Sequence, residues 1–172
     1  MKIRTAISGA TLLALMLTGG AAAADEKSVM EKLAALEGDW MYLDENGEES
    51  DMIGSTFRLT AAGSALVEVM APGSPEGYEM VNMYHADGDR VLMTHYCAAG
   101  NQPRMEVKAT EDENRLELQF ESVTNLASPD AQHMHHAEYI FRGDDRLTTR
   151  WWGMQDGKIS EETTTIELKR KK

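Results

Sequence analysis

Alternation of apolar and polar residues is the feature that most constrains this fold. After residue 38, such residues alternate in short runs separated by Gly, Asp and Asn. A period of two is typical of β-strands that bury one face. We therefore expect an all-β fold with strands at 39–43, 54–60, 64–70, 79–85, 90–97, 104–109, 115–121, 133–142, 146–153 and 158–169.

The joints between these runs are short. Asp87-Gly88 favours a two-residue hairpin turn, and 143–145 and 155–157 are turn-like. Consecutive strands should therefore be antiparallel neighbours. A flat meander would leave two exposed edges, so we expect a closed up-and-down barrel of about 8–10 strands. A two-sheet sandwich is the alternative, and the lack of long crossover connections argues against it.

One segment, at 25–37, has a helical period instead. Its apolar residues recur at spacings of three and four, at Val29, Met30, Leu33 and Leu36. Gly38 follows as a C-terminal stop. We expect one short N-terminal helix that acts as a lid or plug for the barrel.

The first residues have the three parts of a secretory signal peptide. Lys2 and Arg4 precede an apolar stretch at 7–17, and small residues end at Ala24. The stretch is too short for the roughly 20 residues of a membrane-spanning helix. We therefore expect a cleaved signal peptide at 1–24, a single domain at 25–172 and a periplasmic or secreted bacterial protein with no membrane span.

Charge and cysteine content narrow the partners. The net charge is −12, and an acidic surface repels nucleic-acid phosphate, so no nucleic-acid partner is expected. The basic run at 169–172 is interpreted as a frayed tail, with a motif for an anionic partner as the alternative. Cys97 is the single cysteine, which excludes an internal disulfide and favours a buried structural thiol over a reactive or intermolecular one.

Sequence motifs add a resemblance. Gly-Asp-Trp at 38–40 opens the first strand and Arg-Trp-Trp follows at 150–152. This resembles the calycin superfamily, in whose lipocalin-like members a Gly-x-Trp opens the barrel and an arginine from a late strand packs over the tryptophan. The run Thr-His-Tyr-Cys-Ala-Ala-Gly-Asn-Gln-Pro-Arg-Met at 94–105, with His-Met-His at 133–135, is similar to a family of uncharacterised exported calycin-like bacterial proteins. The resemblance implies a lipocalin-like barrel and no particular substrate.

Alternation also predicts which side chains face the interior. On two strands the charged residues cannot all be buried, so the interior set is Met105, Val107, Ala109, Leu116, Leu118 and Phe120. On the strand at 90–97 both faces are plausible. The turn at 87–88 places Tyr84, Asn82 and Met80 opposite Val91, Met93 and His95. If that face is internal, Asn82, His95 and Cys97 lie in a methionine-rich lumen. The methionines that would form its wall for an apolar ligand are Met30, Met70, Met80, Met83, Met93, Met105 and Met134.

Four of the five histidines lie in two places that could converge, and three of them, His95, His133 and His135, form a candidate metal set. His133 and His135 are two residues apart on one strand, so they share a face with Tyr139, whereas His136 points to the other face. Together with His95 they are candidate ligands for haem or a transition metal. The alternative is that they are hydrogen-bonded histidines at a barrel rim.

A polar connection at 101–104 lies at one barrel mouth. Asn101 is a candidate for amide hydrogen bonds to a ligand, and Arg104 for a ligand carboxylate or phosphate. The alternative is an ordinary turn in which Arg104 pairs with a neighbouring acid.

Together these features predict an exported, non-catalytic barrel that binds a small apolar or amphipathic molecule. The candidate ligand-binding residues are Asn82, His95, Cys97, Asn101, Arg104, His133, His135 and Tyr139. A haem- or metal-binding barrel is the second hypothesis. An envelope enzyme centred on Cys97 or a histidine is the third, although the sequence has no Gly-x-Ser-x-Gly nucleophile elbow.

Overall fold

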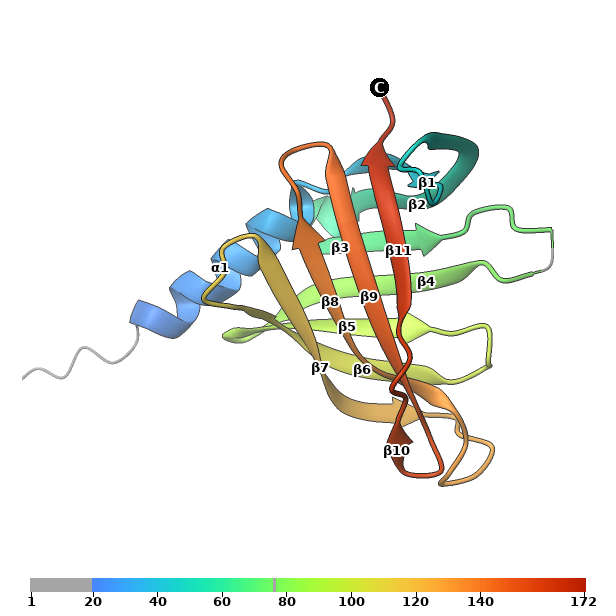
Figure 1. Ribbon diagram of the computed structural model, residues 1–172. Helices are drawn as coiled ribbons and strands as arrows, with labels where there is room; N and C mark the ends of the chain where they lie inside the picture. Colours follow the sequence, from blue (N-terminus) through green and yellow to red (C-terminus); the bar gives the residue numbers. More distant parts are fainter. Residues whose placement is uncertain (1–19, 76) are drawn as a thin grey trace, which may run out of the picture.

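A short helix and one antiparallel sheet make up the fold. The computed structural model describes residues 20–75 and 77–172, and Figure 1 shows the sheet curled into a barrel. The helix is α1 (Gly20–Ala34), and a 3₁₀ turn, η1, spans Ala61–Gly63. The strands are β1 (Gly38–Leu43), β2 (Glu49–Thr60), β3 (Ala65–Met70), β4 (Met80–Asp87), β5 (Arg90–Tyr96), β6 (Gln102–Ala109), β7 (Arg115–Thr124), β8 (His133–Phe141), β9 (Arg146–Gln155), β10 (Lys158–Ile159) and β11 (Thr164–Arg170).

The sheet closes on itself. Consecutive strands pair antiparallel from β1 to β9, β9 pairs with β11, and β11 pairs with β1. Closure satisfies the strand edges that a flat meander would expose. The predicted all-β, up-and-down barrel is confirmed, with ten strands in the ring.

Two predicted elements differ from the structure. The expected strand at 158–169 is two strands, because β10 folds back on β9 while Thr164 begins a separate pairing with Trp151. The helix ends at Ala34 rather than near residue 37, and the next residues form a turn in which Glu37 N–H donates to the Ala34 carbonyl at 3.1 Å.

The helix closes one end of the barrel. α1 packs against β4, β5 and β6 at the end where β1 begins (Figure 1). Val29 and Leu33 of α1, and Leu36 just after it, are buried in the barrel core. The opposite end carries the loop residues 44–48, 71–75, 77–79, 97–101 and 125–132 and is called the distal end below.

Residues 1–19, which hold most of the expected signal peptide, lie outside the described residues, whereas residues 20–24 form the beginning of α1. Among the residues that the structure describes, no helix has both the length and the apolar character needed to cross a membrane.

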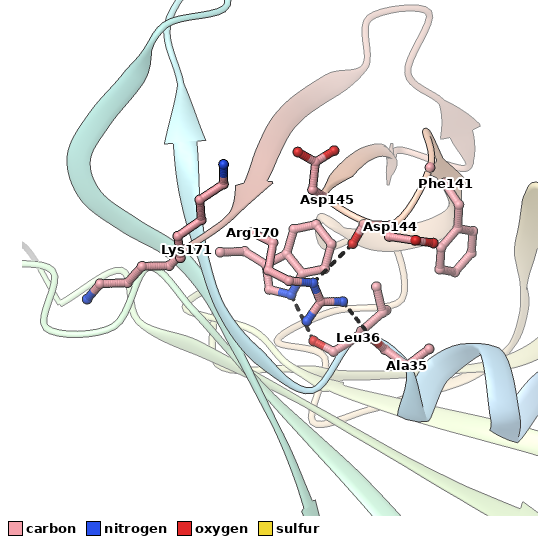
Figure 2. A pocket seen from close by; sticks show the side chains of 10 residues that line it. Ala35, Leu36, Phe141, Asp144, Asp145, Arg170 and Lys171 are labelled. Atoms are coloured by element: carbon pink, nitrogen blue, oxygen red, sulfur yellow. Dashed lines mark hydrogen bonds between the residues drawn. The ribbon is translucent and has the colours of Figure 1, made fainter.

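Arg170 fastens the end that α1 closes. Its guanidinium lies 4.4 Å from the ring centre of Trp40 and donates to the carbonyls of Glu37 at 2.7 Å and Ala35 at 2.6 Å. Figure 2 shows this guanidinium beside the helix end. Arg170 lines a pocket of about 550 Å³ there. The prediction of a frayed tail at 169–172 is therefore wrong for Arg170. Closure of the barrel brings the carbonyl acceptors close to its side chain. The arginine that packs over Trp40 is thus Arg170 of β11 and not Arg150 of the Arg-Trp-Trp run.

The predicted interior positions are occupied largely as expected. Met105, Leu116 and Leu118 are fully buried, and Val107 is nearly so. Ala109 and Phe120 are partly buried. The methionine wall is mixed, because Met70, Met93 and Met105 are core residues, while Met30, Met80 and Met134 pack at its margin and Met83 lies on the opposite face of β4 from buried Asn82 and Tyr84.

The two-residue turn sets the pairing of β4 with β5. Val91 and Met93 belong to the core and His95 is buried on the same face, whereas Thr94 and Tyr96 on the other face are not buried, although Leu92 is, so the face with His95 is internal. Asn82 lies opposite His95. The turn residues are Gly88 and Asp89, and the closing pair is Asp87 with Arg90. Tyr84 therefore lies opposite Met93 rather than Val91, so its partner on β5 is two residues further along than expected.

Candidate functional site

A polar cluster lies within the apolar barrel. Glu68, on β3, is fully buried, and its side chain accepts hydrogen bonds from Ser55 Oγ at 2.9 Å and Asn82 Nδ2 at 2.7 Å. The hydroxyls of Tyr84 and Tyr139 lie 2.7 and 2.8 Å from Glu68 Oε2 and 2.7 Å from each other. Burying a charge is costly unless it is hydrogen-bonded or paired. Here donors from three strands, β2, β4 and β8, surround the carboxyl group. No ion pair among the described residues includes Glu68.

Burial keeps both tyrosines protonated. It raises the pKa of Tyr84 and of Tyr139 well above the ordinary value, and the charge of Glu68 raises both further. Each phenol therefore retains its proton across the physiological range. Since each has a single hydrogen, one hydroxyl donates to the other or both donate to Glu68.

Asn82 connects this cluster to His95. The amide oxygen of Asn82 lies 2.6 Å from His95 Nδ1. Because the carboxylate of Glu68 only accepts, the amide NH₂ must face Glu68 and the amide oxygen must face His95. His95 Nδ1 therefore carries the proton, and Nε2 keeps a lone pair.

His95 Nε2 has no partner. The residue is 1% exposed, and this nitrogen has no hydrogen-bond partner among the described residues. Burial lowers the pKa of His95 to about 4, so the ring is neutral at neutral pH. The ring centre lies 5.3 Å from that of Trp151, which itself lies 6.0 Å from Tyr139. The site thus offers a neutral, fixed acceptor beside an aromatic wall.

Three predicted site residues come together here, namely Asn82, His95 and Tyr139. Asn101 lies at the same distal end of the barrel, 3% exposed. Its Nδ2 donates to the Gln132 carbonyl at 2.9 Å, and its Oδ1 is buried without a partner in the described part of the chain. The backbone N–H of Cys97 donates to the Asn101 carbonyl at 3.1 Å, which ties Asn101 to the end of the strand that carries His95.

Cys97 and Arg104 do not join the cluster as expected. Cys97 is only partly buried and belongs to the turn after β5. Arg104 shares its strand face with Glu106 and Lys108 and pairs with Glu121 at 3.3 Å, on the outer side of β6. Strand alternation directs it there, because Pro103 and Met105 occupy the inner positions. The ordinary ion pair is thus the observed arrangement for Arg104.

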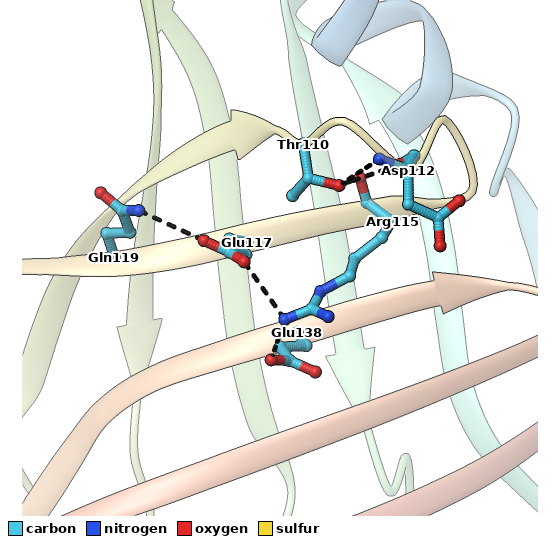
Figure 3. Close-up of polar contacts among 6 residues, drawn as sticks. All are labelled: Thr110, Asp112, Arg115, Glu117, Gln119 and Glu138. Atoms are coloured by element: carbon cyan, nitrogen blue, oxygen red, sulfur yellow. Dashed lines mark hydrogen bonds and ion pairs between the residues drawn. The ribbon is translucent and has the colours of Figure 1, made fainter.

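The remaining histidines lie where β7 and β8 separate. These strands pair only as far as Leu118 and Ala137, and in the paired half Arg115 joins Glu117 and Glu138 on the outer face (Figure 3). Beyond that point a groove of about 490 Å³ lies between the strands.

His135 and His136 line this groove together, with their Nδ1 atoms 3.2 Å apart. Alternation predicts opposite faces for them, and their rings have different neighbours, since His135 stacks on Phe120 and His136 stacks on Trp152 at 4.4 Å. A register shift between Met134 and His136 in the β8–β9 pairing marks a β-bulge, which interrupts strict alternation.

His133 is buried and bonded locally. Its Nδ1 lies 2.9 Å from the Met134 carbonyl, and its ring stacks on Phe120 at 5.2 Å, as does the ring of His135 at 4.8 Å. Across residues 20–75 and 77–172, no three His, Cys, Asp or Glu side chains are grouped so that they could hold a metal ion. The structure therefore does not gather His95, His133 and His135 into the set that the metal hypothesis requires.

Glu68, Tyr84 and Ser55 were missed as site residues. Glu68 shares its strand parity with Leu66 and Met70, both buried. An acidic residue at a core position of an apolar strand was the available signal, because such a residue is almost never fully buried without partners.

Two surface pockets open at the distal end. One, of about 450 Å³, is lined by Asn101 and Gln132. The other, of about 550 Å³, is lined by Tyr42 and Met52. The pKa of Tyr42 is raised by burial and by the charge of Glu68, so this second pocket lies within the electrostatic reach of the buried carboxylate.

Comparison with known proteins finds no matching protein-family model and no matching curated protein. The functional conclusions therefore depend on the arrangement of side chains described above.

Proposed function

We propose that this protein is an exported, non-catalytic barrel that binds a small apolar or amphipathic molecule. The observation that carries the proposal is the unpartnered Nε2 of His95, which Asn82 and Glu68 hold as a neutral acceptor. A buried acceptor without a donor costs about 1–3 kcal/mol, so a bound molecule that supplies a donor would relieve that cost.

The surroundings of His95 suit such a ligand. Trp151 and Tyr139 provide aromatic surface, and Met93 and Met105 are flexible apolar core residues. Since α1 closes the other end, the distal end is the side from which a molecule would enter.

A calycin-like relationship and export belong to the same proposal. The packing of Arg170 over Trp40 supports the relationship, because a late-strand arginine over the Gly-x-Trp tryptophan is the feature that the resemblance implies. Export is supported by the composition of residues 1–24.

Haem or a transition metal is the second candidate ligand. A histidine whose Nδ1–H is held by a neighbouring oxygen, leaving Nε2 free, is the usual arrangement of a metal-ligating histidine. His95 alone would supply the protein ligand, because His133 bonds its own strand. An enzyme centred on Cys97 gains no such support, since Cys97 is a partly buried residue of the turn after β5 and no hydrogen bond in the described part of the chain joins its thiol to a histidine.

Native mass spectrometry of protein purified from its own periplasm tests the proposal. We expect a species heavier than the polypeptide by the mass of one small molecule, and a visible haem band only if the second candidate holds. As a parallel test, N-phenyl-1-naphthylamine should bind and become fluorescent. Ligand-free protein that also fails to bind this probe would overturn the proposal.

A further inference from the structure

The buried groups of the distal half are short of donors. His95 Nε2 and Asn101 Oδ1 are both acceptors, both are buried, and both lack a partner among the described residues. They lie on chain segments joined by the Cys97–Asn101 backbone hydrogen bond. The donors of the polar cluster are already directed to Glu68. A ligand that satisfies this region must therefore bring its own N–H or O–H.

The charge of the interior also disfavours a ligand that is an anion. Within the described residues, Glu68 is the only buried side chain among Asp, Glu, Lys and Arg. Arg104, the predicted partner of a ligand carboxylate or phosphate, lies on the outer face against Glu121. A carboxylate or phosphate that entered would lose its water and meet acceptors and a like charge instead of a cation.

We infer that the barrel selects ligands whose polar group is an uncharged or cationic hydrogen-bond donor, such as an alcohol or an amine, and that it rejects anionic amphiphiles. This inference rests on the proposed function and narrows it to a class of ligand. His95 sets the requirement for a donor, and Glu68 contributes both the orientation of His95 through Asn82 and the repulsion of anions.

Three compounds with the same chain and different polar groups test the selection. Decan-1-ol, decylamine and decanoate are titrated at pH 7 against protein carrying N-phenyl-1-naphthylamine, and loss of probe fluorescence gives each affinity. We expect the alcohol and the amine to bind at least about tenfold more tightly than decanoate, because an unmatched buried polar group costs about that factor or more. Decanoate binding as tightly as decan-1-ol would overturn the inference while leaving the proposed function standing. Failure of the probe and of all three compounds to bind would instead overturn the proposed function.

A variant separates the interior site from the acidic surface. His95→Leu removes the acceptor and keeps an apolar side chain, so the preference for decan-1-ol over decanoate should fall by about tenfold. His85→Leu is the matched control, because His85 is on the opposite face of β4 from Asn82 and bonds only the neighbouring Ala86 carbonyl. Thermal melting verifies that both variants are folded. An undiminished preference in folded His95→Leu would assign the selection to surface charge and overturn the inference.

Discussion

Asn82 and His95 face each other across β4 and β5, and the 2.6 Å contact between them determines which ring nitrogen of His95 carries the proton. The orientation of Asn82 is determined in turn by Glu68, which can only accept. One carboxylate on β3 therefore defines the hydrogen-bonding character of a ring two strands away.

Acid should destabilise the protein through His95. Burial lowers the pKa of His95 to about 4 in the folded protein, against about 6.5 for an exposed histidine. The unfolded chain therefore binds the proton first, and stability is lost as the pH falls from about 6.5 to about 4, by about 3 kcal/mol in total. Urea unfolding at pH 7 and pH 4 should show this loss in the wild type and a smaller loss in His95→Leu. An equal loss in both proteins would contradict the prediction.

Arg170→Met should weaken the closed end of the barrel. The change removes the contact with Trp40 and the hydrogen bonds to the Glu37 and Ala35 carbonyls, so we expect unfolding free energy to fall by about 2–3 kcal/mol. Lys172→Met, at an exposed position, should change it by less than about 0.5 kcal/mol. Urea midpoints measure both, and similar losses in the two variants would show that Arg170 has no special role.

Gly54→Ala should also be destabilising. A Cβ atom at Gly54 would lie 2.4 Å from Leu168 Cδ2 and 3.0 Å from the Tyr42 ring. Because Leu168 is buried, we expect a loss of about 1–3 kcal/mol. Gly153→Ala is the control, since its nearest neighbour would be 3.7 Å away. Thermal melting should separate the two, and equal melting temperatures would refute the close approach at Gly54.

Leu118→Asp should prevent folding. Leu118 is fully buried, and an unpaired charge there costs several kcal/mol against a total stability of about 5–15 kcal/mol. The adjacent Gln119→Asp places the same side chain on the exposed face and should fold normally. Circular dichroism and a cooperative melting transition distinguish these outcomes, and a normal transition in Leu118→Asp would disprove the interior position of this residue.

Local signals were sufficient for most of the fold. Alternation located Met105 and Leu118 in the core, and the turn at 87–88 predicted that β4 and β5 form a hairpin. The predicted register was wrong by two residues because Asp87 belongs to the strand rather than to the turn. The separate β10 was missed because it is defined by antiparallel pairing with Met154 and Gln155 of β9. Alternation of apolar and polar residues does not indicate which strand a residue pairs with.

The site was harder to predict for a related reason. Val67 and Val69 flank Glu68, so both faces of its strand contain apolar residues. Burial of Glu68 is favourable only because Ser55 and Asn82 from the two neighbouring strands, and Tyr139 from a strand distant in sequence, converge on it. Likewise, the bulge at His135 arises from pairing with β9, and no property of the His-Met-His motif itself indicates it.

Closure through β1 and β11 makes this barrel slow to complete. Met41 pairs with Lys169, so the ring cannot close until almost the entire described chain has taken its place. Contacts between residues so distant in sequence slow folding, because loop closure must precede the gain from pairing. Until β11 arrives, β1 and β9 each keep an open edge on which another unfinished chain can pair. The interval before that last pairing is therefore the time when this protein is most prone to aggregate.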